Sequence, residues 1–373
     1  MKILLLGEYS NVHQNLATGL RALGHEVTVA SDGDGWKNYR RDIDLSRKST
    51  GYVDSIKFYI KLCQQFRSFK NYDVVQIINP VFLSLKAERI WKFYKFLRQN
   101  NKKVFLGAFG MDHYYVKTCL DGHTFRYSDF NLDQQIRISK ENAIWLNDWL
   151  KGEKGKLNQY IAQDCDGIIA GLYEYYVSYQ KDYKEKLVHI PFPIHLNSKE
   201  EFKVRGKNSK IRFFIGIQKK RSEYKGTDIM LKALQRLEKD YPSLCEIVKV
   251  ESVPFYQYIQ LMDDSDVILD QLYSYTPAMN ALEAMAKGLV VVGGGEPEYY
   301  ELIGDDTLKP VINVLPDEEH VFTSLQHILK NSHLVETLSL KSRQFIEKYH
   351  DCIIVAQQYI DFWGNNSSEQ LSK

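Results

Sequence analysis

The chain has 373 residues, of which 44% are hydrophobic and 26% are charged, with a net charge of +2. This composition is typical of soluble globular proteins and excludes a disordered or fibrous chain, and the length suffices for two domains of ordinary size. No apolar run approaches the roughly 20 residues that span a bilayer. The N-terminal MKILLLGEYS has too short an apolar core for a signal peptide and predicts a first strand instead. The five cysteines are scattered without CxxC spacing, so we expect reduced thiols in a cytoplasmic protein.

The charge is unevenly distributed along the chain. Residues 1–190 contain 28 Lys and Arg against 21 Asp and Glu, a net charge of +7. Residues 191–373 contain the remaining 21 against 26, a net charge of −5. The first half therefore favours anionic partners, and the second half does not.

Short apolar runs alternate with helical patterns in the first half. We expect strands at 2–7, 25–30, 73–78, 103–108 and 167–171, with helices at 11–23, at 82–99 and after residue 171. The alternation then restarts, with strands at 210–217, 245–250, 266–271 and 289–294 and helices at 226–239, 255–263 and 277–287. Nearly continuous apolar strands separated by helices indicate parallel sheets covered on both faces.

The predicted fold class is therefore α/β, with two doubly wound Rossmann-like domains that face a cleft. The proline-bearing and then charged stretch between the two series predicts a linker. The domain boundaries are 1–192, a linker at 193–209, a second domain at 210–345 and a C-terminal helix at 346–363. That helix, the end of a helical pattern at about 335–363, either packs back on the first domain or covers the second.

The helix predicted at 277–287 has features of a ligand site. Thr276 and Ser274 are candidate caps, and Pro277 suits a first turn. The free amides of a helix N-terminus bind phosphate, and Glu283 is placed to accept the hydroxyls of a ribose. An ordinary helix with a solvated Glu283 explains the same pattern when it is taken alone.

A glycine corner follows the next strand. Gly293, Gly294 and Gly295 let the backbone approach a ligand without obstruction by Cβ atoms. Glu296 and Glu298 come directly after this corner, at a predicted strand end.

A basic loop lies at the start of the second series. Lys219, Lys220, Arg221 and Lys225 cluster between Gly216 and Gly226, where a strand leads into a helix. Arg can bind a diphosphate bidentately, and Lys can act as a point charge. A solvated surface loop is the alternative for a basic stretch of this kind.

Together these segments resemble the donor-binding half of the retaining GT-B glycosyltransferases of the "group 1" type. The resemblance lies in Lys225-Gly226, in Glu283-Ala-Met-Ala-Lys-Gly288 and in DDSDVILDQL at 263–272. It covers most of 210–363 and, more loosely, 7–27. It implies transfer of a sugar from a nucleoside-diphosphate sugar, which is a substrate, so that no cofactor is needed. The donor-binding residues it implies are Gly216, Lys220, Arg221, Lys225, Gly226, Thr276, Asn280, Glu283, Gly294, Gly295 and Glu298.

The chain departs from this family in two places. The first Glu of the E-x7-E motif, a usual contact of the donor sugar, is replaced by Tyr275, and Lys220 stands where the loop arginine is usual. By the same resemblance, His113 contacts the donor sugar near the reacting carbon, and His13 belongs to the acceptor-facing loop. The implied catalytic residues are His113, Glu283, Lys225 and Arg221.

The remaining predictions concern metal, acceptor and membrane. Asp32-Gly-Asp34 resembles a metal-binding DxD motif but lies in a loop of the first domain, so we expect a metal-independent enzyme. Basic, aromatic-containing segments at 56–70 and 86–103 suit an anionic membrane surface and a glycan or lipid-linked acceptor at the inner face of the membrane. Two amphipathic helices packed on the sheet explain these segments equally well. No nucleic-acid recognition motif is present.

Two other function classes compete with a transferase. A catalytically degenerate GT-B-like binding or scaffold protein is favoured by Tyr275. A dinucleotide-dependent oxidoreductase is disfavoured, since GEYSNVH after the first strand lacks GxGxxG.

Overall fold

The computed structural model of the chain describes residues 1–49, 51–137, 139–196, 202–206, 209–218, 221–251 and 253–365. The chain divides into two units. The first unit comprises Met1–Asp121, Ile138–His195 and Cys352–Lys373, and the second comprises Gly122–Arg137 and Leu196–Asp351. The prediction of an α/β fold with two doubly wound Rossmann-like domains is confirmed.

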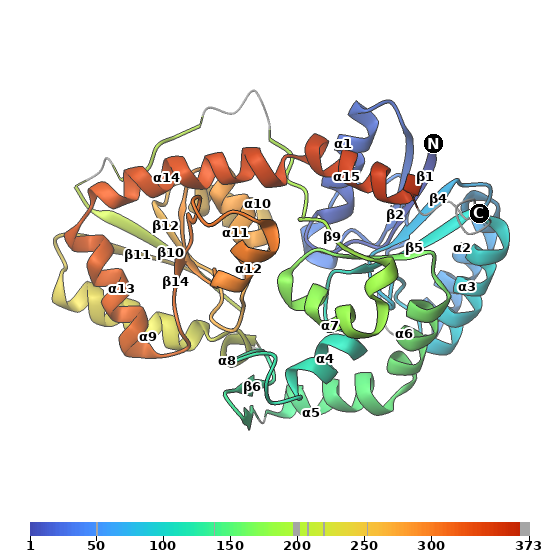
Figure 1. Cartoon of the computed structure of the whole chain (residues 1–373), viewed down its shortest axis with the longest axis horizontal. Helices are drawn as coiled ribbons and strands as arrows, with labels where there is room; N and C mark the ends of the chain where they lie inside the picture. The colour runs from blue at the N-terminus through green and yellow to red at the C-terminus, as the bar shows by residue number, and fades with distance from the viewer. Residues whose placement is uncertain are drawn as a thin grey trace. The chain divides into compact units, whose positions relative to one another are not determined.

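The first unit is built on a parallel sheet with the strand order β3-β2-β1-β4-β5-β8-β9 (Figure 1). Its central strands are apolar runs that are buried on both faces, as a sheet covered by helices requires; Leu4 and Leu5 of β1 have no exposed surface. The strands are β1 (Lys2–Leu6), β2 (Glu26–Ser31), β3 (Ile43–Asp44), β4 (Val74–Ile77), β5 (Lys103–Ala108), β8 (Gly167–Ala170) and β9 (Leu187–His189).

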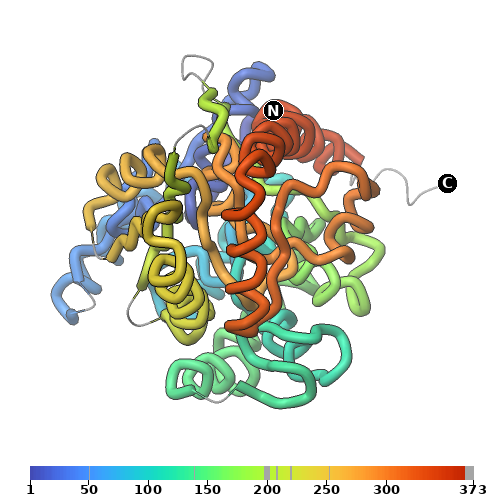
Figure 2. The backbone as a smooth tube through the Cα atoms, turned by 90° about the vertical axis from the view of Figure 1, so that its left-hand side faces the viewer, coloured from blue at the N-terminus to red at the C-terminus, as the bar shows by residue number. Residues whose placement is uncertain are grey.

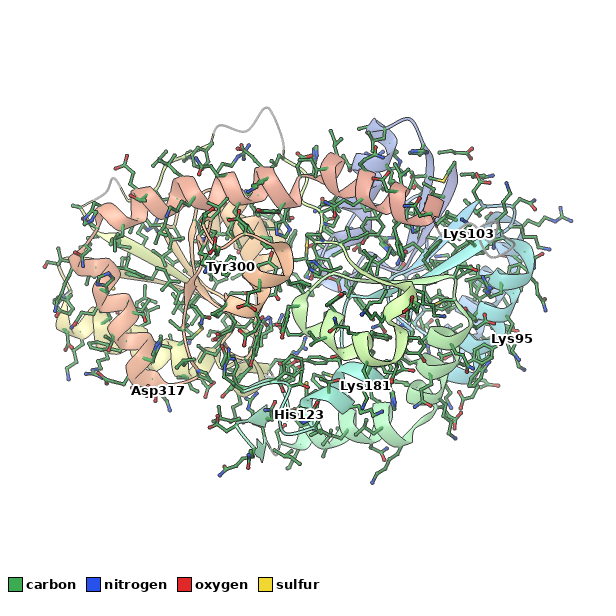
Figure 3. The ribbon with its side chains drawn as sticks, in the orientation of Figure 1. Lys95, Lys103, His123, Lys181, Tyr300 and Asp317 are labelled. Atoms are coloured by element: carbon green, nitrogen blue, oxygen red, sulfur yellow. The ribbon has the colours of Figure 1, made fainter. Side chains whose placement is uncertain are left out.

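Eight described α-helices belong to the first unit. The C-terminal helix α15 packs on α1, and a Cβ atom at Gly19 of α1 would lie only 1.9 Å from the carbonyl oxygen of Cys352. Lys103, labelled in Figure 3, donates a hydrogen bond of 2.7 Å from Nζ to the carbonyl oxygen of Trp363 in α15. The helices are α1 (Val12–Ala22), α2 (Tyr52–Gln64), α3 (Ala87–Asn100), α4 (His113–Cys119), α5 (Lys140–Leu146), α6 (Glu153–Asp164), α7 (Tyr173–Tyr183) and α15 (Cys352–Asn365).

The second unit has a five-stranded parallel sheet with the order β11-β10-β12-β13-β14. Helices α9 and α13 pack against each other, in yellow and orange-red in Figure 2, and line one core with the strands. The strands are β10 (Ile211–Ile217), β11 (Cys245–Glu251), β12 (Val267–Leu269), β13 (Val290–Gly293) and β14 (Ile312–Asn313). The helices are α8 (Ser222–Lys225), α9 (Thr227–Asp240), α10 (Phe255–Asp263), α11 (Met279–Ala286), α12 (Pro297–Ile303), α13 (Glu318–Lys330) and α14 (His333–Phe345).

Two segments belong to a different unit from the one that the sequence predicts for them. Gly122–Arg137, which contains the short antiparallel pair β6 (Asn131–Leu132) and β7 (Gln135–Ile136), belongs to the second unit. Part of the predicted linker also packs there, because the buried Arg205 donates hydrogen bonds to the carbonyl oxygens of Asp263 and Lys287. Residues 197–201 and 207–208 of that linker lie outside the described residues.

The single helical pattern expected at 335–363 is wrong. Helix α14 ends at Phe345, a π-helical turn covers Ile346–His350, and α15 begins at Cys352. Asp351 between them has φ −54° and ψ 128°, which is not helical, and Asp is a poor residue for a helix interior. Among the described residues no helix is long and apolar enough to cross a membrane.

Candidate functional site

The candidate site lies at one edge of the second sheet. The loops after β10, β12 and β13 meet there, because neighbouring parallel strands all present their carboxyl ends at the same edge. These three loops contain the basic loop, Asp270 to Thr276, and the glycine corner. The structure thus brings the three predicted segments together within one unit.

The basic loop is attached to the segment after β12. The backbone N–H of Leu272 donates a hydrogen bond of 3.0 Å to the carbonyl oxygen of Lys225. Gly226 has φ +72°, which favours glycine, and a Cβ atom there would lie 2.8 Å from Cβ of Leu272. Arg221 is exposed, with its guanidinium 5.1 Å from the ring centroid of Tyr224. Lys219 and the predicted site residue Lys220 lie outside the described residues.

A buried carboxylate connects this loop with α11. Asn280 of α11 donates a hydrogen bond of 2.9 Å from Nδ2 to Oδ1 of Asp270 and accepts one of 2.9 Å from the hydroxyl of Tyr258. Burial raises the pKa of Asp270, and the positive charge of Lys225 and the hydrogen bond from Asn280 oppose that rise. Tyr258 also explains Gly216, since a Cβ atom there would lie 2.8 Å from its hydroxyl. Lys225 and Asn280, both predicted to bind the donor, therefore act on one carboxyl group.

Helix α11 starts later than the sequence predicts. Its first residue is Met279, the preceding Ala278 makes no side-chain cap, and the hydroxyl of Ser274 donates instead to the carbonyl oxygen of Thr276. The predicted capping by Ser274 or Thr276, with Pro277 in the first turn, is therefore wrong. Thr276 is buried and Glu283 of α11 is half-buried.

The glycine corner is packed against the protein itself. A Cβ atom at Gly294 would lie 2.1 Å from the carbonyl oxygen of Ser274, and one at Gly295 would lie 2.8 Å from Cβ of Val311. The backbone N–H of Gly295 donates to Oδ1 of Asn313 at 3.0 Å. Gly294 therefore allows the segment around Ser274, and Gly295 the segment at Val311, to lie directly against the end of β13.

The carboxylates after the corner bind an arginine that the sequence analysis missed. Arg126, from the segment Gly122–Arg137, donates hydrogen bonds to Glu296 at 2.7 Å and to both carboxylate oxygens of Glu298. The Tyr127 hydroxyl also donates to Glu296, as does Nδ2 of Asn313 at 2.8 Å. Burial alone would raise the pKa of Glu298, but the hydrogen bonds from Arg126, a backbone hydrogen bond and the positive charge of Arg126 together outweigh burial and leave this pKa lowered. Glu298, predicted to contact the donor, is thus part of an ion-pair network.

The same segment covers the residue that replaces the first Glu of the E-x7-E motif. Tyr275 is 1% exposed, and its hydroxyl accepts a hydrogen bond of 2.7 Å from the backbone N–H of Arg126. The guanidinium of Arg126 lies 5.0 Å from the centroid of the Tyr275 ring, and the rings of Phe125 and Tyr127 pack against it at 5.5 and 5.2 Å. Tyr275 is therefore a buried packing residue in this position.

A second arginine fixes the other end of the segment to the basic loop. The guanidinium of Arg137 lies 3.3 Å from the ring centroid of Tyr273 and donates to the carbonyl oxygen of Glu223 at 2.6 Å. Tyr224 of α8 donates from its hydroxyl to Asp129 at 2.5 Å. These contacts join residues 86 to 136 positions apart, so no local sequence pattern could have indicated them.

His113, the residue predicted to act near the reacting carbon, starts α4 in the first unit. Its Nδ1 is 2.8 Å from the carbonyl oxygen of Trp149, and its Nε2 is 2.8 Å from Nε2 of Gln159. Burial lowers the pKa of His113, so the ring is neutral at neutral pH. The neighbouring Asp112 caps α4 by accepting from the N–H of Tyr115, and burial raises its pKa to about 6.

The two basic helices, α2 and α3, differ in which of their apolar side chains are exposed. In α3 the aromatic residues face inward: Phe93 and Tyr94 are buried, and Trp91 packs on Tyr160 at 4.8 Å. In α2 one face is apolar and exposed, at helical spacing. This face consists of Tyr52, Val53, Ile56, Tyr59 and Ile60, which are 43 to 81% exposed.

Comparison with known proteins shows the fold. No family model matches the chain, and no curated protein matches it in sequence. Among solved structures, Anabaena HepE in complex with UDP and glucose is 14% identical over 98% of this chain and 100% of its own, with a TM-score of 0.58. Sucrose-phosphate synthase from Thermosynechococcus elongatus is 12% identical over 98% and 99%, with a TM-score of 0.61. UDP-GlcNAc 2-epimerase from Neisseria meningitidis, bound to UDP-GlcNAc, is 12% identical over 97% and 99%, with a TM-score of 0.53. The chain therefore has the GT-B architecture of these enzymes.

Proposed function

We propose that this protein is a glycosyltransferase that moves a sugar from a nucleoside-diphosphate sugar to a hydroxyl of a glycan or lipid-linked acceptor. The observation that carries the proposal is the convergence of Lys225, Asp270 and Asn280 at the carboxyl edge of the second sheet, beside α11. Cations, helix amides and a half-buried carboxylate at one edge are the chemistry that a nucleoside diphosphate needs.

The roles follow from this arrangement and from the family resemblance. The amides at the start of α11 and the cations Lys225, Arg221 and Lys220 bind the diphosphate, and Glu283 accepts the ribose hydroxyls. The diphosphate charge that develops as the glycosidic bond breaks is then met by fixed positive charge and by the helix dipole. We accordingly propose that no metal ion is required.

The reaction itself is a substitution at the anomeric carbon, and the resemblance implies retention. The acceptor oxygen bonds to that carbon, and the carbon–oxygen bond to the diphosphate breaks with its electron pair going to the diphosphate. The departing diphosphate takes the acceptor proton. His113 is proposed as a contact of the donor sugar, in its neutral form, and the hydrogen bonds at Trp149 and Gln159 hold its ring.

The uridine nucleotide is the first donor to consider, because HepE and the epimerase are both described with UDP or a UDP-sugar. Because a transferase and an epimerase share this architecture, an activity assay must distinguish between the two reactions. A transferase consumes the acceptor and releases the nucleoside diphosphate, whereas an epimerase changes the sugar without an added acceptor.

We also propose contact with an anionic membrane surface through α2. Its exposed apolar face lies beside α3, as the guanidinium of Arg89 is 5.5 Å from the ring centroid of Tyr59. The two helices and the residue that precedes α3 carry exposed basic residues: Lys57, Lys86, Arg89, Lys92 and Lys95, the last labelled in Figure 3. Apolar residues bordered by cations match an anionic lipid surface, which would place the enzyme at the inner face of the membrane.

The proposal is tested by thermal shift with UDP, GDP, ADP, CMP and dTDP and their common sugars, each with and without EDTA. One nucleotide should raise the melting temperature of the wild type regardless of EDTA. Lys225→Ala and Glu283→Ala should abolish that rise, and Lys232→Ala, on the exposed face of α9, should preserve it. A response to no nucleotide would overturn the donor site, and nucleotide binding without turnover would support the degenerate scaffold instead.

A further inference from the structure

One segment of the second unit contacts all three loops of the proposed donor site. This segment is Gly122–Arg137, called the strap below. Its Arg126 binds the carboxylates after the glycine corner and the hydroxyl of Tyr275 in the loop after β12, and its Arg137 binds the basic loop. The strap therefore joins the ends of three parallel strands, and its contacts with the basic loop concern the cations proposed to bind the diphosphate.

The basic loop has little structure of its own. Helix α8 is a single turn, and its four residues are all half-buried or exposed. A first helical turn costs more conformational entropy than its one hydrogen bond returns, so a helix of this length is not stable by itself. Arg221 precedes this turn and Lys225 ends it. The positions of both cations therefore depend on contacts from other parts of the second unit.

Arg137 of the strap supplies the first of these contacts. Its Nη2 donates to the carbonyl oxygen of Glu223 at 2.6 Å, and its Nη1 is 3.4 Å from that of Tyr224. The same Nη1 is 3.0 and 3.2 Å from the carbonyl oxygens of Ser128 and Asp129 within the strap. Carbonyl groups in the last turn of a helix have no intrahelical partner. One planar guanidinium thus joins the carbonyl groups of α8 to those of the strap.

Tyr273 packs on both Arg137 and the end of α8. The guanidinium of Arg137 lies 3.3 Å from the centroid of the Tyr273 ring. A Cβ atom at Gly226 would lie 3.0 Å from Cε2 of Tyr273, so a glycine lets the backbone after α8 approach this ring. The carbonyl oxygen of Lys225 accepts from the N–H of Leu272 at 3.0 Å. The backbone that carries Lys225 is therefore fixed by the strap and by the loop after β12.

Asp129 of the strap acts on the second cation. Its Oδ2 accepts a hydrogen bond of 2.5 Å from the hydroxyl of Tyr224. The ring of Tyr224 lies 5.1 Å from the guanidinium of Arg221, within the range of a cation–π interaction. The hydroxyl contact thus fixes the ring on which Arg221 packs. Each cation is connected to the strap, Lys225 through Arg137 and Arg221 through Asp129.

The strap has a framework of its own hydrogen bonds. Asn131 is 3% exposed, and its Nδ2 donates to the carbonyl oxygens of Phe125 at 2.8 Å and Asp133 at 3.0 Å. The backbone N–H of Arg137 donates to the carbonyl oxygen of the fully buried Phe130 at 2.8 Å. The strap therefore presents Arg137 and its own carbonyl groups to α8 from an ordered backbone.

We propose that the strap positions the cations that bind the donor diphosphate, with Arg137 and Asp129 as its positioning residues. Arg137 acts through Lys225, and Asp129 acts through Tyr224 on Arg221. Cations that are already fixed bind a diphosphate more tightly, because the cost of ordering the loop is not paid on binding. The role of the diphosphate rests on the proposed function, whereas the fixing of α8 by the strap does not.

The test measures dissociation constants of UDP, GDP and ADP by isothermal titration calorimetry on the full chain. Arg137→Ala should weaken nucleotide binding about tenfold, the effect of one hydrogen bond to a charged group. Tyr224→Phe keeps the ring and every charge but loses the contact with Asp129, and should weaken binding about threefold. Arg236→Ala is the matched control, because its guanidinium also packs on a ring, that of Phe322 at 3.7 Å, but near the C-terminal end of α9. It should bind as the wild type does.

Two further measurements separate positioning from a general loss of structure. Since Arg137 acts through Lys225, Arg137→Ala should no longer weaken binding when it is added to Lys225→Ala. The matching nucleosides lack the diphosphate, so their binding in saturation-transfer NMR should be the same in Arg137→Ala and the wild type. Without nucleotide, amide hydrogen exchange in α8 should be faster in Arg137→Ala and Tyr224→Phe than in the wild type.

Weaker diphosphate binding in both variants, together with faster exchange in α8, would support the proposal. Unchanged binding in Arg137→Ala, an equal loss of nucleoside binding, or an additive loss in the double variant would each overturn it. A loss in Arg137→Ala with none in Tyr224→Phe would assign the effect to the charge of Arg137 and would also overturn the positioning role.

The same samples distinguish this proposal from the proposed function. Nucleotide binding that Lys225→Ala abolishes, but that neither strap variant changes, would reject the positioning role and leave the transferase standing. Faster exchange in α8 of the strap variants, with no nucleotide bound by the wild type, would overturn the donor site and the role of the diphosphate, and leave only the fixing of α8.

Discussion

Two buried carboxyl groups, one in each unit, differ in what compensates for the cost of their burial. One is paired with a cation, and the other is bound by backbone N–H groups. Glu296 in the second unit is 4% exposed and is met by Arg126, Tyr127 and Asn313. Glu8 in the first unit is 3% exposed, and the backbone N–H groups of Tyr9, His13 and Gln14 are the partners described for it. A nearby cation or hydrogen-bond donors favour the ionised form of a buried carboxyl group, and burial that outweighs them favours the protonated form.

The partners of Glu296 and Glu8 show how each carboxyl group is used in the fold. The hydrogen-bonding capacity of Glu296 is used within the second unit, where it fixes Gly122–Arg137 over Tyr275. Glu8 is bound by backbone N–H groups at the start of α1, and burial outweighs these hydrogen bonds and raises its pKa to about 8. Exposure alone would not have separated the two groups, since both are almost completely buried; their partners separate them.

The largest effect should come from Arg126→Ala. Removing the cation leaves Glu296 buried without a charged partner, and it also ends the contacts with Glu298 and with the ring of Tyr275. Loss of one partner of a buried ion pair costs roughly 3–5 kcal/mol, and the partial exposure of Arg126 places the expected loss near the lower end. Urea denaturation followed by near-UV circular dichroism would measure it.

A double variant isolates the cause of this loss. Glu296→Gln removes the buried charge, so Arg126→Ala combined with Glu296→Gln should be more stable than Arg126→Ala alone. A double variant that is no more stable than the single one would show that packing on Tyr275, and not the unpaired carboxylate, explains the loss.

The next effect concerns Glu8 and the pH dependence of stability. An unfolded Glu ionises near pH 4.5, whereas folded Glu8 keeps its proton to about pH 8. Unfolding therefore releases one proton between these values, and the free energy of unfolding falls as pH rises through this window. His13 and Asp112, with pKa values of about 3 and about 6, contribute mainly at lower pH. Between pH 6.5 and 8 the expected loss is about 2 kcal/mol.

Glu8→Gln should remove this slope. The variant loses the hydrogen bond from one α1 amide but carries no titrating group, so its stability should be nearly constant from pH 6.5 to 8. Thermal melts across this range would show it, with Glu141→Gln as the control that retains the wild-type slope. A wild-type curve that is already flat would mean that Glu8 is ionised when folded, and the comparison with Glu296 would fail.

Much of the fold could be predicted from the sequence, because it depends on local patterns. Apolar runs such as 2–7 and 210–217 match β1 and β10 closely, and the loops after β10, β12 and β13 converge because parallel strands end at one edge. The break at Asp351 and the late start of α11 at Met279 were missed, since both depend on tertiary packing that overrides a helical pattern.

The site was harder to predict because it depends on contacts between residues far apart in the sequence, as those of Arg126 show. The sequence places Arg126 between 149 and 172 residues from Tyr275, Glu296 and Glu298, and no spacing rule joins a loop of the first series to a strand end of the second. Glu296 and Glu298 therefore looked like free carboxylates at a ligand site. The sequence shows that Tyr275 stands at this position, but it does not show which residues contact Tyr275. Those contacts determine whether the position is accessible to a ligand.

The smallest effect should come from Glu298→Gln. This variant tests how much each of the two ion pairs of Arg126, with Glu296 and with Glu298, contributes to stability. Glu298 is 27% exposed in its side chain and Arg126 is 50% exposed, so water screens their attraction, and Arg126 keeps Glu296 when Glu298 is neutralised. Exposed ion pairs contribute roughly 0–1 kcal/mol, and we expect a loss of about 0.5 kcal/mol at neutral pH. Because the pKa of Glu298 is lowered in the folded protein, its contribution is present above the pKa of an unfolded Glu and disappears as the pH falls. The wild type and Glu298→Gln should thus converge in acid in urea titrations. A loss at neutral pH as large as that of Arg126→Ala would instead mean that Glu298, and not the buried Glu296, holds Gly122–Arg137 in place.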